Sequence, residues 1–278
     1  MQLQIYAISE LLDKSFLEDY GLRGDITSEA VITDKGKTEF KINARQDIVL
    51  CGTQIAEYYF DKYSEIEYKL HYKDGDSVKK SSTVISGFGR AKEILLLERI
   101  ILNYLQHLSG IATTTRLYVD KIKGTGARIC DTRKTTPMLR QLQKYAVTCG
   151  GGYNHRLTMD GGILIKDNHI AICGGVTEAI KQAAKNSPHY VKIEVECDTL
   201  DQVQEAIDAS ADIIMLDNMN IDQVRRAVDI IGDKAIIEAS GNISLETVSE
   251  IAKAGVHVIS VGRITHSAPS VDIGLDIL

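Results

Sequence analysis

The chain has 278 residues, of which 44% are hydrophobic and 25% are charged, and its formal net charge is −6. This composition is typical of a folded globular protein and excludes a disordered or collagen-like chain, while the net acidity argues against non-specific nucleic-acid binding. No apolar run approaches the roughly 20 residues that span a bilayer, and the N-terminus lacks a secretory signal pattern, so we expect a cytoplasmic protein without a membrane anchor.

The first part of the chain predicts a mixture of helices and strands. Helical spacing of apolar residues predicts helices over residues 8–20 and 54–63, the first ended by a glycine-rich loop at 21–25. Strands are predicted over residues 38–50, 65–71 and 78–87. Residues 91–123 keep helical spacing with an interruption at Ser109-Gly110, so we expect two successive helices and a domain boundary after residue 110.

Beyond residue 110, short β-rich runs alternate with amphipathic helices. Strands are predicted over residues 127–131, 163–166, 191–196, 212–217, 235–240 and 256–262, and helices over 200–210, 221–231 and 244–255. The last four strands end 21 to 23 residues apart, the length of one strand, one helix and their loops. This regularity predicts an α/β fold with a parallel sheet, either a βα barrel or a doubly wound sheet. Because no G-x-G-x-x-G opens a helix after a strand, a dinucleotide-binding fold is disfavoured.

Each predicted strand of this second part ends in polar residues or glycine. In a βα barrel the loops after the strands gather on one rim, where the functional residues of such enzymes lie. The strand ends carry Asp131 with Thr132-Arg133-Lys134, then Lys166, Glu196, Asp217, Ser240-Gly241-Asn242 and Gly262. One polar strand end is ordinary, but six in succession favour a binding site.

Positive charge is concentrated between residues 131 and 169, where six Lys or Arg side chains stand against three Asp. Such a run is commonly a solvated basic face. A cluster of Arg133, Lys134, Arg156 and Lys166, however, would be unstable if buried together without a ligand, so these four residues favour an anionic ligand. Glu196 and Asp217 offer acceptors for sugar hydroxyls, for a divalent cation such as Mg²⁺, or for both, although Glu196 alone could simply pair with a rim lysine. The turn Ser240-Gly241-Asn242 fits a phosphate group.

These residues lie in motifs that resemble the quinolinate phosphoribosyltransferase family. The motifs are Asp131-Thr132-Arg133-Lys134-Thr135, Gly150-Gly151-Gly152 with Asn154-His155-Arg156, Leu164-Ile165-Lys166-Asp167-Asn168-His169, Glu194-Val195-Glu196, Leu216-Asp217-Asn218, Ser240-Gly241-Asn242-Ile243 and Ser260-Val261-Gly262. The resemblance covers essentially the whole chain, including Gly24-Asp25-Ile26-Thr27-Ser28 near the start.

The resemblance implies a fold and an assembly. It implies an N-terminal α/β sandwich domain of residues 1–110, completed by the tail 267–278, and an incomplete βα (TIM-like) barrel of residues 111–266. It also implies a homodimer with shared active sites. The implied reaction transfers the phosphoribosyl group of phosphoribosyl pyrophosphate to quinolinate with decarboxylation, in the presence of Mg²⁺, and gives nicotinate mononucleotide, pyrophosphate and CO₂ in NAD biosynthesis.

The matched motifs imply a role for each candidate residue. Quinolinate's carboxylates would meet Arg133, His155, Arg156 and Lys166, with Arg99 supplied by the neighbouring subunit. Lys134 would serve the pyrophosphate, Glu196 and Asp217 the ribose and the metal, and Ser240, Gly241, Asn242 and Gly262 the 5′-phosphate, while Thr132 and Ser260 are further substrate-binding candidates. Lys134, Glu196 and Asp217 are the catalytic candidates. We expect no covalent nucleophile and no organic cofactor, and the five cysteines, with no C-x-x-C pair, should be reduced packing residues.

Three positions depart from the family pattern. Met138 stands where glycine is common, Thr158 lies in a stretch that usually contains glycine, and Arg263 stands where small residues are usual. These departures concern loop conformation rather than the reaction. Two other functions are considered: a non-catalytic binding protein for phosphorylated metabolites, and a related barrel enzyme with another pyridine or carboxylate substrate. The intact cations and both carboxylates, Glu196 and Asp217, favour the transferase.

Overall fold

The computed structural model describes residues 3–33 and 36–278. The chain forms two compact units, the first comprising residues 1–116, 136–151 and 267–278 and the second comprising residues 117–135 and 152–266. The predicted α/β class is confirmed, with an antiparallel sheet in the first unit and a parallel sheet in the second. The domain limits of 1–110 and 111–266 stay predictions.

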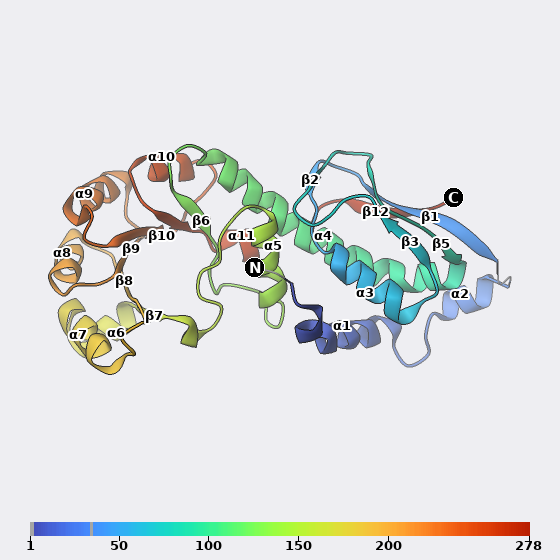
Figure 1. Ribbon diagram of the computed structural model, residues 1–278, viewed down its shortest axis with the longest axis horizontal. Coiled ribbons are helices and arrows are strands. Elements are labelled where there is room, and N and C mark those ends of the chain that lie inside the picture. The colour runs from blue at the N-terminus through green and yellow to red at the C-terminus, as the bar shows by residue number, and fades with distance from the viewer. Residues whose placement is uncertain (1–2, 34–35) are drawn as a thin grey trace. The chain divides into compact units, whose positions relative to one another are not determined.

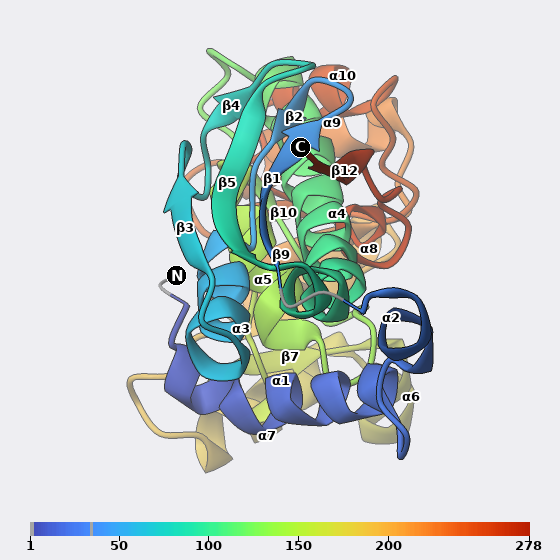
Figure 2. The ribbon, with the colours of Figure 1, turned by 90° about the vertical axis from the view of Figure 1, so that its right-hand side faces the viewer.

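The main sheet of the first unit has four antiparallel strands in the order β12-β1-β5-β3. These are β1 (Lys37–Ala44), β3 (Glu67–Leu70), β5 (Thr83–Arg90) and β12 (Ile273–Ile277), while β2 (Ile48–Val49) pairs separately with β4 (Ser77–Val78). The predicted strands over 38–50 and 78–87 are thus each divided in two. Strand β12, from the last residues of the chain, pairs antiparallel with β1 in a register that joins Phe40 to Ile277 (Figure 2).

Helices α1 (Ile5–Tyr20), α2 (Ile26–Val31) and α3 (Thr53–Tyr63) belong to the same unit. Helix α3 packs on the sheet through Phe60, whose ring centroid lies 5.9 Å from that of Phe40. Helix α1 packs on α3, and the Tyr59 hydroxyl donates to the Leu12 carbonyl at 2.9 Å. The predicted helices over 8–20 and 54–63 are confirmed. Helix α2 is not among the predicted helices, although Asp25 caps it by accepting from two backbone N–H groups.

The two helices predicted over residues 91–123 are wrong, because α4 (Ala91–Lys121) is one continuous helix. Ser109 and Gly110 lie inside it for packing reasons. The Ser109 hydroxyl accepts from the Cys51 N–H at 2.9 Å, and a Cβ on Gly110 would lie only 2.1 Å from the Pro269 carbonyl oxygen. Small residues at these positions therefore allow the backbone of Cys51 and of Pro269 to approach α4 closely, and they do not end the helix.

The basic run expected between residues 131 and 169 is divided between the two units. Helix α5 (Arg140–Cys149) lies in the first unit, where the side chain of Lys144 is fully buried. Tyr145 anchors this helix, because its hydroxyl donates to Asp74 at 2.9 Å and accepts from Gln54 at 3.1 Å. Lys144 therefore belongs to the packing of α5, whereas Arg140, at the start of this helix, is half-buried.

The second unit contains six parallel strands in the order β6-β11-β10-β9-β8-β7. They are β6 (Arg128–Cys130), β7 (Ile163–Ile165), β8 (Ile193–Cys197), β9 (Ile213–Asp217), β10 (Ile236–Ser240) and β11 (Val258–Ser260), one within each predicted strand or one residue beyond it. Since β6 and β7 are the two edges of this sheet, the barrel is incomplete.

Helices lie on the outside of these strands (Figure 1). They are α6 (Asp167–Cys173), α7 (Val176–Asn186), α8 (Leu200–Asp208), α9 (Ile221–Ile231) and α10 (Val248–Lys253). The short helix α11 (Arg263–His266) follows β11, and a 3₁₀ turn lies at Met159–Gly161. Thr199 and Asn220 start α8 and α9 through capping boxes with Gln202 and Gln223. The predicted helix over 244–255 is shorter than expected, because Ser244 and the residues after it form turns before α10 begins.

Candidate active site

A cavity of about 700 Å³ lies at the carboxyl ends of the barrel strands. Ten of the predicted site residues line it: Thr132, Arg133, Lys134, His155, Arg156, Lys166, Glu196, Asp217, Ser240 and Ser260. All six strands contribute, because each strand end or the loop after it supplies at least one of these side chains. The parallel arrangement thus brings residues far apart in the sequence to one rim.

Two guanidinium groups lie close together on one wall of this cavity. Burial lowers the pKa of Arg156, and the nearby Arg133 charge lowers it further. Arg156 Nη1 donates to the Gly162 carbonyl at 2.7 Å, whereas its Nε is buried without a hydrogen-bond partner among the described residues. A buried, unsatisfied donor beside a second cation favours an anionic ligand that accepts hydrogen bonds from both.

The carboxylates of Glu196 and Asp217 lie on another part of the wall. Burial raises the pKa of Glu196, and the Asp217 charge raises it further, although the ion pair that Glu196 forms with Lys166 works in the opposite direction. Burial and the Asp198 charge also raise the pKa of Asp217. Because both carboxylates are partly buried and a neighbouring carboxylate raises the pKa of each, this part of the cavity suits a bound cation or hydroxyl donors.

A buried layer of polar residues lies behind the cavity wall. His155 Nε2 lies 3.2 Å from a Glu194 oxygen and 3.7 Å from a Glu238 oxygen, and the Ser260 hydroxyl donates to Glu238. Burial and the Glu194 charge raise the pKa of Glu238 to about 7. The Ser260 hydroxyl is therefore occupied by Glu238, while the predicted contacts of Ser260 and His155 with substrate stay predictions.

The last strand ends bring backbone close to the cavity. Gly241 has a φ of +87°, and a Cβ there would lie 2.3 Å from the Asn218 amide oxygen, so glycine is required. The Asn242 amide donates to the same Asn218 oxygen at 3.1 Å. A Cβ on Gly262 would lie 3.1 Å from Lys134. Gly241, Asn242 and Gly262 thus adjoin residues that line the cavity.

Two residues important for the geometry are absent from the predictions. Asp198 lines the cavity just after β8, and Glu238 lies buried in the middle of β10. A charged residue inside an otherwise apolar strand is a signal that could have identified Glu238. Arg99 is exposed on α4, within the first unit, and its place at the site stays a prediction.

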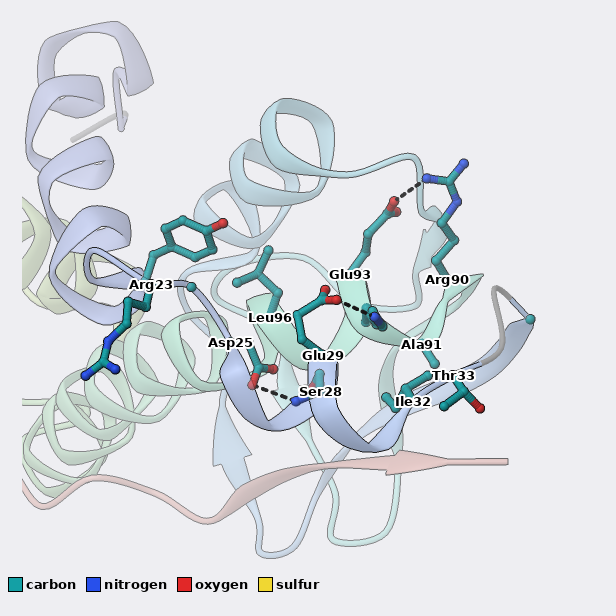
Figure 3. Close-up of a pocket in the computed structure, with 14 residues that line it drawn as sticks. Arg23, Asp25, Ser28, Glu29, Ile32, Thr33, Arg90, Ala91, Glu93 and Leu96 are labelled. Atoms are coloured by element: carbon teal, nitrogen blue, oxygen red, sulfur yellow. Dashed lines mark hydrogen bonds and ion pairs between the residues drawn. The ribbon is translucent and has the colours of Figure 1, made fainter.

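Another cavity, of about 470 Å³, lies in the first unit between α2 and the start of α4 (Figure 3). Two ion pairs lie in its wall: Glu29 with Lys92 at 2.7 Å, and Glu93 with Arg90 at 3.4 Å. Asp25, on the same wall, accepts from the N-terminal N–H groups of α2. In the barrel cavity, by comparison, two groups of like charge, the guanidinium groups of Arg133 and Arg156, lie near one another.

Comparison with known proteins identifies the family. Two family models match, the quinolinate phosphoribosyl transferase N-terminal domain over residues 25–109 and the C-terminal domain over residues 111–276. The chain belongs to the quinolinate phosphoribosyltransferase family. The resemblance seen in the sequence motifs is thereby confirmed.

Relatives match over nearly the whole chain. The probable carboxylating nicotinate-nucleotide pyrophosphorylase of Bacillus subtilis is 44% identical over 97% of this chain and 93% of its own length. The corresponding protein of Methanocaldococcus jannaschii is 43% identical over 99% of both chains. The crystal structure of the Ehrlichia chaffeensis nicotinate-nucleotide pyrophosphorylase covers 100% of both chains at 44% identity, with a TM-score of 0.94.

The departures from the family pattern lie in exposed segments. Met138 is exposed and has a φ of +67°, the left-handed conformation that glycine adopts without strain. Thr158 precedes the 3₁₀ turn, and Arg263 begins α11. Among residues 3–33 and 36–278, every helix is too short or too polar to serve as a membrane span.

Proposed function

We propose that this chain transfers the phosphoribosyl group of phosphoribosyl pyrophosphate to quinolinate with loss of CO₂, giving nicotinate mononucleotide and pyrophosphate for NAD biosynthesis. Membership of the quinolinate phosphoribosyltransferase family over both domains supports the reaction. The observation that carries the proposal is the barrel cavity, in which Arg133, Arg156 and Lys166 converge with Glu196 and Asp217.

The cationic wall binds quinolinate. Arg133 and Arg156 each offer a planar fork of N–H donors, which matches a carboxylate, and two carboxylates on one ring offset the repulsion between the two guanidinium groups. Lys166 has three N–H donors and so keeps Glu196 while donating to the substrate. These contacts hold the pyridine nitrogen toward the ribose carbon that it attacks.

The acidic wall binds the ribose. Breaking the bond between C1 and pyrophosphate develops positive charge on the sugar ring, and the carboxylates of Glu196 and Asp217 stabilise that charge while accepting hydrogen bonds from ribose hydroxyls. Lys134 lies in the loop beside Gly262 and binds the departing pyrophosphate. Thr132, Ser240, Gly241, Asn242 and Gly262 adjoin this region and form the site of the 5′-phosphate and the sugar.

The donor set fits Mg²⁺. Glu196 and Asp217 are partly buried carboxylates with raised pKa values, and Asp198 lies near Asp217. Their oxygen atoms are suitable ligands for a divalent cation. Glu196 and Asp217 are the residues that would hold the ion. When bound with pyrophosphate, Mg²⁺ supplies positive charge that offsets the negative charge of the leaving group.

Decarboxylation follows from the product's own chemistry. Once the pyridine nitrogen carries the ribose, its positive charge stabilises negative charge on the adjacent carbon, so the carboxylate on that carbon leaves as CO₂, and the carbon then takes up a proton from water to give nicotinate mononucleotide. The chain's residues position the ring and neutralise its charges. We also propose a cytoplasmic homodimer in which a second copy supplies Arg99, because this arginine is exposed on α4.

The direct test is turnover by the purified protein. Folded protein incubated with quinolinate, phosphoribosyl pyrophosphate and Mg²⁺ at pH 6–8 should release CO₂ and form nicotinate mononucleotide. Absence of release, with calorimetry showing that both ligands bind, would indicate a binding protein instead. Equal turnover of nicotinate would indicate a barrel enzyme with a different substrate.

A further inference from the structure

A set of buried polar groups supports the loop that carries Arg156. We call His155, Glu194, Glu238 and Ser260 the buried support. The side chains of Glu194 and Glu238 are only 7% and 5% exposed, and both face His155 Nε2, at 3.2 and 3.7 Å. Ser260 on β11 donates to Glu238 on β10. The support thus joins three strands of the barrel to one loop.

The hydrogen bonds of His155 determine which ring nitrogen carries the proton. The backbone N–H of Arg156 donates to His155 Nδ1 at 2.8 Å, so Nδ1 must offer a lone pair. The proton of the neutral ring then lies on Nε2 and is donated toward Glu194 and Glu238. The His155 backbone N–H is also held, because it donates to an Asp131 oxygen at 2.9 Å.

This proton arrangement argues against a metal in the support. The ligand atoms of His155, Glu194 and Glu238 lie within 4.8 Å of one another, a spacing that a metal ion would also permit. A metal bound at Nε2, however, requires the proton on Nδ1, where it would face the Arg156 N–H donor. The cluster is therefore a hydrogen-bonded support.

We propose that Glu194 and Glu238 are positioning residues for substrate binding: they hold His155 in its Nε2–H form, and the adjoining backbone thereby fixes the Arg156 guanidinium at the cavity wall. This proposal rests on the proposed function, because only in that function does the Arg156 guanidinium bind a carboxylate of quinolinate. Neither glutamate is among the residues lining the cavity, so both act through His155 and Arg156. The charge of Glu194 also offsets part of the repulsion between Arg156 and Arg133.

The kinetic test removes the carboxylate of Glu194, which accepts from His155, while nearly keeping the volume of the side chain. Glu194→Leu should raise the KM for quinolinate about tenfold. The kcat and the KM for phosphoribosyl pyrophosphate should change less than about threefold, because the substitution weakens the binding of quinolinate and not the chemical step. Glu194→Gln keeps an acceptor oxygen and should restore the KM to within about threefold of wild type. Glu178→Leu, which removes an exposed carboxylate of α7 in the same unit, is the matched control and should behave as wild type.

Two further measurements separate positioning from general damage. If Glu194 acts through Arg156, the double variant Glu194→Leu with Arg156→Ala should bind quinolinate no more weakly than Arg156→Ala alone. Additive losses, or an equal loss for phosphoribosyl pyrophosphate, would overturn the proposal.

The second measurement is NMR of the wild-type protein. It requires neither enzyme activity nor a variant that could fail to fold. The ¹⁵N chemical shifts of His155 in the intact wild-type protein at pH 7.5 should show a proton on Nε2 and none on Nδ1. A proton on Nδ1, in the neutral or the charged ring, would overturn the proposal even if the enzyme is active. Conversely, wild-type protein with the expected His155 state and no turnover would refute the proposed function while leaving the support intact.

Discussion

Replacing Arg156 by alanine should separate ligand binding from folding stability. Without ligand, the guanidinium donates to the Gly162 carbonyl at 2.7 Å and to the Met159 carbonyl at 3.3 Å, while Arg133 repels it and lowers its pKa. The hydrogen bonds and the repulsion oppose one another, so we expect the free energy of unfolding to fall by about 1 kcal/mol or less. The ligand-free protein therefore loses little when the guanidinium is removed.

The ligand-bound protein loses much more. Each charged hydrogen bond to a carboxylate contributes about 1.5–3 kcal/mol, so the loss of one or two should weaken quinolinate binding by about 2–4 kcal/mol, or roughly 30- to 1,000-fold. Calorimetric titration measures the binding change, and urea unfolding measures the stability change. Arg156→Lys keeps the charge without the planar fork and should lie between wild type and Arg156→Ala. Unchanged affinity for quinolinate would refute the reasoning, as would a loss of stability as large as the loss of binding.

Three other predictions concern packing, titration and assembly. Gly110→Ala, normally favourable inside a helix, should instead destabilise the protein by about 3 kcal/mol in urea unfolding, because the new Cβ would lie 2.1 Å from the Pro269 carbonyl oxygen; a gain in stability would contradict this close contact. Because the pKa of Glu238 is raised from 4.5 to about 7, the folded protein holds a proton that the unfolded chain releases, so stability should fall by up to about 3 kcal/mol as pH rises from 4.5 to above 7. Glu238→Gln should remove that part of the slope between unfolding curves at pH 4.5 and 8, and an unchanged slope would assign it to other groups. Finally, mixing inactive Arg99→Ala and inactive Arg156→Ala subunits should restore part of the CO₂ release, and no recovery after verified subunit exchange would argue against Arg99 crossing between subunits.

The strand ends illustrate what could be predicted along the chain. In a parallel βα repeat, each strand, loop and helix has a characteristic length, so the positions of Glu196, Asp217 and Ser240 could be placed at one rim from spacing alone. The structure confirms that these residues line one cavity. The motif resemblance led to the same residues, because the family's binding groups occupy these strand ends.

The errors arose where contacts between distant residues decide the outcome. The Ser109-Gly110 pair looks like a helix break, yet α4 continues because the hydroxyl of Ser109 bonds with Cys51 and the bare backbone of Gly110 admits Pro269. Lys144 is one of the six basic residues counted between residues 131 and 169, yet it is buried in α5 within the first unit. Local spacing carries no information about either neighbour.

The sequence by itself determined the α/β class, the parallel repeat and most of the cavity-lining residues, because strand and helix periodicities and strand-end polarity are local properties of the chain. Only the tertiary structure decided that Glu194 and Glu238 lie together behind His155 and that Glu196 pairs with Lys166. These features depend on distances between side chains from different strands, and such distances are set by barrel packing rather than by neighbours in the sequence.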